Sequence, residues 1–188
     1  MRRDGKSAMF QSDTRTSLSS SAPATAPITA IKNFIHKAFC TALSPLTATA
    51  NGLQSTIGAG AGANGGVGFI LGIAADAGVQ FVADRHGNAG VAITLGGNPG
   101  YGVFGVGATA GAQGSISTVD TIYDLRGPAW DFGVSGSLPT GEGISADVAI
   151  SGPDATLTVT GGLSIGGKGT ALAGNYTFVP SLLSTNCR

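Results

Sequence analysis

From Gly65 onward, bulky apolar residues alternate with small or polar residues along the chain. A period of two is typical of β-strands, because successive side chains of a strand point to opposite faces. One face of each expected strand therefore carries bulky residues, and the other carries mostly Gly, Ala, Ser and Thr. The bulky positions are Val67, Phe69, Leu71 and Ile73; Ala89, Val91, Ile93 and Leu95; Trp130, Phe132 and Val134; Ile144, Ala146, Val148 and Ile150; Leu157 and Val159; and Leu172, Tyr176 and Phe178.

Turn sequences separate these segments at a spacing of about 10–12 residues, which is typical of a β-sandwich or barrel. The turns are expected at 84–88, 96–100, 126–128, 139–141, 152–154 and 166–169. Short, regular connections favour an antiparallel meander, and closing it removes exposed strand edges. The sequence therefore predicts an all-β domain over residues 66–180, with about 8–10 strands in a closed or nearly closed barrel.

Residues 28–45 show the spacing of an amphipathic helix, which Pro45 is expected to end. We expect its apolar face to pack on or in the barrel, and binding to an anionic membrane is the alternative. A Gly/Ala/Thr-rich linker at 46–65 and a C-terminal tail at 181–188 complete the predicted organisation. The helix packing face consists of Ile31, Phe34, Ile35, Phe39 and Leu43.

Charge is unevenly distributed along the chain. Residues 1–50 have a net charge of +4, whereas residues 51–188 have eight acidic and four basic residues, a net charge of −4. An acidic folded domain argues against binding to nucleic acid. No apolar run is long enough for a transmembrane helix. Residues 1–27 are rich in Ser and Ala, so we expect a low-complexity arm, with a targeting segment as the alternative.

Motifs that could carry catalysis lack their structural context. Ser164 lies in a G-x-S-x-G pattern, but a further expected strand follows it where a nucleophile elbow needs a helix. His36 and His86 have no partner ligand at a recognisable spacing, so both are interpreted as solvated polar residues. We therefore expect no enzyme activity, no catalytic residues, no cofactor and no metal site.

The chain contains two cysteines, Cys40 on the expected helix and Cys187 next to the C-terminal residue. A disulfide between them would tie the helix to the tail and indicate an oxidising compartment. In the chain-entropy account such a bond contributes about 4–5 kcal/mol. The alternative is a pair of unrelated thiols in a reducing compartment.

The segment GVQFVADRHGNAGVAITLGGNPGYG (78–102) and the later TIYDLRG (121–127) contain a D-x-x-G-N-x-G hairpin and a Gly-Gly-Asn-Pro-Gly turn. In these features, residues 65–180 resemble a glycine-rich β-domain of the C-terminal regions of bacterial RHS-repeat and polymorphic-toxin-like proteins. The resemblance implies a secreted or delivered protein that acts on membranes or neighbouring cells. It assigns no catalytic residue, and this chain carries no RHS repeats.

Together these patterns predict a non-enzymatic β-barrel that acts through its low-charge Gly/Ala/Ser/Thr face. We expect it to form a homo-oligomer or to bind a protein partner through that face. A membrane-inserting or pore-forming protein is the first alternative, and a carrier of a small apolar ligand is the second. The expected location is secreted or extracytoplasmic, with targeting to an organelle as the alternative.

Overall fold

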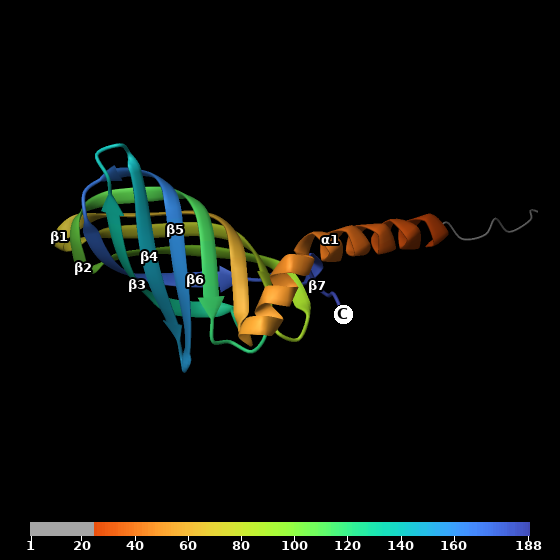
Figure 1. Cartoon of the computed structure of the whole chain (residues 1–188). Helices are drawn as coiled ribbons and strands as arrows, with labels where there is room; N and C mark the ends of the chain where they lie inside the picture. The colour runs from red at the N-terminus through yellow and green to blue at the C-terminus, as the bar shows by residue number, and fades with distance from the viewer. Residues whose placement is uncertain (1–24) are drawn as a thin grey trace, which may run out of the picture.

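The computed structural model describes residues 25–188, which form one helix followed by an antiparallel β-barrel (Figure 1). The helix α1 lies at one end of the barrel and extends beyond it. We call this the helix end, and the opposite end, with the turns at 138–141 and 167–168, the far end. The elements in chain order are α1 (Thr25–Leu53), β1 (Thr56–Ala83), β2 (Asn88–Ser117), β3 (Gly127–Ser137), β4 (Glu142–Ser151), β5 (Asp154–Gly166), β6 (Gly169–Phe178), the 3-10 helix η1 (Ser181–Leu183) and β7 (Ser184–Asn186).

Strand β2 closes the barrel. The strands follow the order β1-β2-β5-β4-β3-β6, and β2 also pairs with β6. The second half of β2 pairs with β5 and its first half pairs with β6, so the ring returns to the same strand. Strand β1 pairs with β2 along its whole length and is itself bent, since a Cβ added at Gly60 would overlap the carbonyl oxygen of Val79. Glycine therefore permits the close approach of the two halves of β1.

The predicted fold class, an all-β barrel with one helix, is confirmed, but the strands are fewer and longer than the pattern indicates. Among the described residues there are seven strands, and β1 and β2 comprise 28 and 30 residues. The turn expected at 96–100 lies inside β2. Its glycines bend the strand instead of ending it, and Gly105 nearby has a φ of +97° that other residues rarely adopt. The strand order also departs from a simple meander, because β2 is followed in the sheet by β5 instead of β3 and pairs with β6 as well.

The helix runs past Pro45 to Leu53, so neither the expected end at Pro45 nor the linker at 46–65 is found. Proline lacks an N–H and cannot donate to the carbonyl of Thr41. The hydroxyl of Ser44 donates to that carbonyl at 3.0 Å, which compensates for the lost bond. Strand β1 begins at Thr56, ten residues before the predicted domain boundary.

Only the C-terminal part of the predicted helix face packs against the barrel. Leu43 is buried in a cluster with Ile57 and Ala83, and the Phe39 ring lies edge-on to Phe81 with centroids 6.4 Å apart. Phe34 and Ile35 do not pack against the barrel, since they are 74% and 59% exposed. The side chain of Ile31 lies outside the described residues. The physical reason is that the N-terminal part of α1 extends beyond the barrel.

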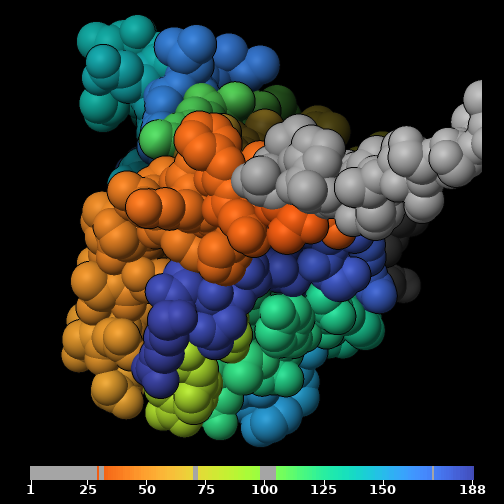
Figure 2. Space-filling model, turned by 90° about the vertical axis from the view of Figure 1, so that its right-hand side faces the viewer, coloured from red at the N-terminus to blue at the C-terminus, as the bar shows by residue number. Residues whose placement is uncertain are grey.

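The C-terminal residues are not a free tail. Strand β7 pairs with the first residues of β2, from Asn88 to Gly90. Figure 2 shows the helix and the C-terminal segment lying side by side at the helix end. The predicted arm at 1–27 lies outside the described residues, except for 25–27, which belong to α1.

Candidate functional site: an acidic lumen inside an apolar wall

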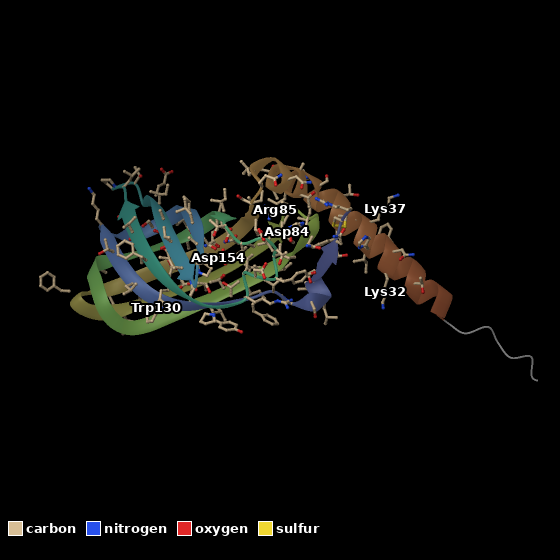
Figure 3. All side chains as sticks on the ribbon, turned by 90° about the horizontal axis from the view of Figure 1, so that it is seen from below. Lys32, Lys37, Asp84, Arg85, Trp130 and Asp154 are labelled. Carbon is tan, nitrogen blue, oxygen red and sulfur yellow. A yellow bond between two sulfur atoms is a disulfide. The ribbon has the colours of Figure 1, made fainter. Side chains whose placement is uncertain are left out.

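The orientation of the side chains on β3 is the reverse of that in a soluble barrel. Trp130, Phe132 and Val134 face outward and are 62%, 55% and 45% exposed. Asp131 and Gly133 alternate with them and face the interior, which we call the lumen. Figure 3 shows Trp130 on the outer surface. A soluble barrel would bury the three bulky residues and expose the carboxylate.

The same reversal holds around the barrel. We use the term outer wall for the outward-facing side chains of β1–β6. Within the described side chains, Glu142 at the start of β4 is the one charged residue on the outer wall. Exposed bulky residues of the outer wall include Val67, Ile73, Val79, Phe81, Leu95, Val106, Ile116, Trp130, Phe132, Val134, Ile144, Ile150, Leu157, Val159, Leu163, Ile165, Tyr176 and Phe178.

The lumen is lined by polar side chains. The Ser and Thr residues of the small-residue face line the interior. Self-association or partner binding through that face stays a prediction. Alternation along a strand is the same whichever face points inward, which is why the pattern left the orientation open. Polar residues that line the larger lumen cavity include Asn64, Asp76, Gln80, Thr94, Gln113, Ser115, Asp131, Asp147, Thr158, Asn175 and Thr177.

Two cavities of about 80 Å³ and 50 Å³ occupy the lumen. The larger extends toward the helix end and the smaller toward the far end. They have in common the residues Asn64, Asp76, Asp131 and Asp147, which therefore stand where the two cavities meet. We call these four residues the constriction. Each cavity is large enough for at least one water molecule, whose share of liquid volume is about 30 Å³.

Hydrogen bonds connect the constriction across the lumen. The Asn64 side-chain amide donates to an Asp147 carboxylate oxygen at 2.8 Å and to the Ser145 hydroxyl oxygen at 2.6 Å. Strands β1 and β4 are separated by β2 and β5 in the ring, so this contact spans the interior. The Asn175 amide donates to Asp131 at 3.1 Å. The constriction is therefore a polar network held from several strands.

All ionisable side chains that line the two lumen cavities are acidic. Among the described side chains, no Lys, Arg or His lines either cavity, whereas Asp76, Asp131 and Asp147 line both. Asp124 and Asp154 line the larger cavity where it reaches the helix end. Several buried oxygens in this region make no hydrogen bond within the described chain: Asp76 Oδ1, Gln113 Oε1, Asp131 Oδ1, Thr160 Oγ1 and Asn175 Oδ1.

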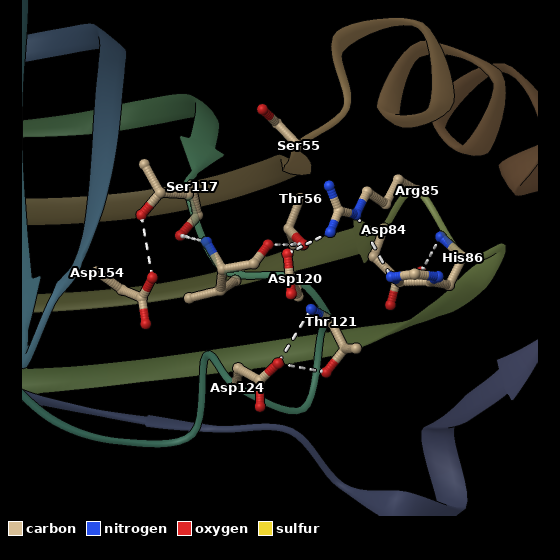
Figure 4. Close-up of polar contacts among 12 residues, drawn as sticks. Ser55, Thr56, Asp84, Arg85, His86, Ser117, Asp120, Thr121, Asp124 and Asp154 are labelled. Atoms are coloured by element: carbon tan, nitrogen blue, oxygen red, sulfur yellow. Dashed lines mark hydrogen bonds and ion pairs between the residues drawn. The ribbon is translucent and has the colours of Figure 1, made fainter.

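Asp84 organises the loops at the helix end, where Figure 4 shows the surrounding polar contacts. Its carboxylate is fully buried and accepts hydrogen bonds from the backbone N–H of His86 at 2.8 Å and of Ile122 at 3.0 Å. It also accepts from the backbone and side chain of Asn88 at 3.0 and 2.8 Å. Ile122 is buried against Val82 on the lumen side. Asp84 therefore joins the β1–β2 turn to the loop between β2 and β3, and it belongs to the D-x-x-G-N-x-G pattern.

Replacing Asp84 by alanine is expected to lower the free energy of unfolding by about 2–3 kcal/mol, because buried N–H groups lose their acceptor. The measurement is urea unfolding of the folded protein and of the variant. Asp120→Ala is the matched control, since Asp120 is exposed and pairs with Arg85 at 2.6 Å. An exposed pair of this kind contributes less than about 1 kcal/mol. Equal losses in the two variants would contradict the structural role of Asp84.

The two cysteines lie together in the structure, whereas the other candidate residues, His36, His86 and Ser164, lie apart from one another. Cys40 and Cys187 are bonded, with an S–S distance of 2.04 Å, which confirms the predicted disulfide. His36 lies on α1, where its Nδ1 is 2.9 Å from the Thr185 hydroxyl, and His86 is exposed in the β1–β2 turn. Ser164 is buried in β5 and donates to the carbonyl of Ala108 at 3.0 Å. The disulfide is compatible with an oxidising, extracellular location.

The constriction was missed in the sequence because its carboxylates are far apart in the chain.

No protein-family model matches the chain, and no curated protein or solved structure matches it significantly. The resemblance to RHS-associated domains therefore stays a prediction. Within residues 25–188, no helix is long and apolar enough to cross a bilayer. No group of three or more His, Cys, Asp or Glu in that range could hold a metal ion.

Proposed function

We propose that the protein is an integral membrane β-barrel whose outer wall contacts lipid acyl chains. The observation that carries this proposal is the reversed alternation, with bulky apolar residues outside and carboxylates inside. Water on the outer wall would solvate an apolar surface far larger than monomeric soluble proteins expose. Lipid removes that cost, and it is the environment in which apolar-out, polar-in strands are stable.

Strand length and aromatic placement support the same function. Strands β3, β4 and β6 comprise 11, 10 and 10 residues. A tilted strand of roughly 9–11 residues crosses the hydrocarbon core of a bilayer. Trp130 and Tyr176 lie on neighbouring strands near the helix end, because Trp130 pairs with Gly174 and Pro128 with Tyr176. Trp and Tyr favour the boundary between lipid and water.

The exposed side chains of helix α1 support the proposal that the helix end of the barrel lies at a membrane surface. Its exposed Phe34 and Ile35 lie in the same part of the helix as Lys32 and Lys37 (Figure 3). Apolar and basic side chains combined on one helix suit the boundary of an anionic membrane. The disulfide supports an oxidising compartment for this membrane surface and is compatible with a secreted or extracytoplasmic protein.

The test is flotation of the folded protein with liposomes of phosphatidylcholine and phosphatidylglycerol, followed by an alkaline carbonate wash. We expect the protein to float and to stay with the lipid after the wash, because the barrel is embedded. A monodisperse monomer in detergent-free buffer that stays below the lipid would contradict the proposal. A stable detergent-free homo-oligomer that does not float would instead support self-association through the outer wall.

A further inference from the structure

We propose that the lumen selects small monovalent cations over anions and conducts them through the constriction. This inference rests on the proposed membrane location. Its structural basis is the convergence of three carboxylates, from β1, β3 and β4, on the point where the two lumen cavities meet. No basic side chain among the described residues lines either cavity, so this negative charge has no partner within the lumen.

The uncharged polar groups around the carboxylates independently indicate a ligand of positive charge. Asn175 is only 8% exposed and lines the larger cavity, and its amide nitrogen is committed to Asp131. Its Oδ1 has no hydrogen-bond partner within the described chain, and neither has Gln113 Oε1. A buried amide oxygen without a donor is costly. A cation interacts favourably with such an oxygen, directly or through its hydration water, whereas the partial negative charge of the oxygen repels an anion.

The geometry distinguishes a mobile monovalent cation from a fixed divalent metal. Calcium requires about six to eight oxygens at close distance. No three acidic side chains of the described chain converge closely enough to hold a metal ion. Carboxylates arranged around a lumen, by contrast, raise the local concentration of cations without binding one tightly. The constriction therefore acts on a hydrated cation that exchanges with solution.

The constriction also contains a contact that limits passage. The Asn64 amide reaches across the lumen to Asp147 and Ser145, and Asn64 and Asp147 line both cavities. On the helix end, the cavity passes beside the buried Ile122 cluster to Asp124 and Asp154. Removing the Asn64 side chain is therefore expected to widen the path while leaving the three carboxylates in place.

The test is current through a planar bilayer of neutral phosphatidylcholine with a tenfold KCl gradient. We expect a reversal potential of the sign for K⁺ selectivity, and a ratio of K⁺ to Cl⁻ permeability that falls roughly tenfold in the triple variant D76N/D131N/D147N. The variant Asn64→Ala is expected to pass several times more current and to stay cation-selective. Glu142→Gln is the control, because it removes one negative charge from the outer wall instead of the lumen.

Each outcome separates this inference from the proposed function. If the triple variant fails to fold, the sign of the reversal potential in the wild type and in Asn64→Ala decides the test. Anion selectivity, or an unchanged permeability ratio in a folded triple variant, would overturn the inference. A carbonate-resistant barrel that passes no current, either as the wild type or as Asn64→Ala, would overturn it too, while the membrane location would stand. Failure to float would overturn the proposed function itself.

Discussion

Replacing Phe132 by arginine is expected to prevent stable insertion of the barrel into liposomes. Phe132 lies near the middle of β3, and its neighbours on the adjacent strands are Val148 and Leu172. An arginine on the lipid face costs roughly 2–4 kcal/mol at the middle of the bilayer. Loss of the phenyl ring from the apolar phase adds about 2 kcal/mol. We expect the floating, carbonate-resistant fraction to fall to a small part of the wild-type value.

Leu138→Arg is the matched control for this prediction. Leu138 is 60% exposed, close to the 55% of Phe132, but it lies in the turn between β3 and β4 at the far end. A turn outside the hydrocarbon core tolerates a charge, so this variant is expected to insert like the wild type. In a water-soluble barrel the two substitutions would be equivalent, because both residues would contact solvent. Equal flotation of the two variants would therefore rule out a lipid-facing outer wall.

The sequence predicts the strands of this fold well but leaves the direction of their faces open. Around Asp131, the order Trp130-Asp131-Phe132 defines two faces and puts the aromatic rings on one of them. Which face points inward depends on the closure of the sheet, which is a long-range property. Asp131 is partly buried and both rings are exposed, so the face that carries the carboxylate points inward. This orientation supports lipid instead of water as the environment of the outer wall.

Local turn and helix signals were misleading where other hydrogen bonds compensate for them. The glycines at 96–100 favour a turn, yet pairing with β1 on one side holds them in an extended strand. Pro45 favours the end of a helix, yet the Ser44 hydroxyl bonds the carbonyl that the proline leaves without a donor. The helix continues, and Ala50 is then buried against the barrel. The pairing with β1 has no signal in the local sequence around 96–100, whereas the serine that compensates for Pro45 stands directly before it in the chain.

The constriction could have been predicted only in part. Asp76, Asp131 and Asp147 each occupy a position of the small-residue face in an alternating segment, and this is visible in the sequence. Asp131 and Asp147 lie on the consecutive strands β3 and β4, but their meeting with Asp76 of β1 at one level of the lumen depends on the closure of the barrel. The same strand order places Trp130 and Tyr176 on neighbouring strands.

The disulfide has a larger structural role than a link between two ends of the chain. Cys40 lies on α1, and Cys187 follows β7, whose partner is the beginning of β2. The Cys187 backbone N–H donates to the carbonyl of Gly87 at 2.8 Å, and Arg188 reaches Asn51 at the end of α1. The bond therefore fixes the helix to the β1–β2 turn. The two cysteines are 147 positions apart, and the chain segment between them contains all the strands of the barrel.

Removing this bond is expected to lower the free energy of unfolding by about 5 kcal/mol, because a loop of that length restricts the unfolded chain strongly. The measurement is urea unfolding of the oxidised protein and of the variant Cys40→Ser/Cys187→Ser in the same detergent. Reductant added to the variant is the control and is expected to change nothing. Equal midpoints would contradict the prediction. Faster amide exchange confined to α1, with an unchanged barrel midpoint, would show instead that the bond restrains only the helix.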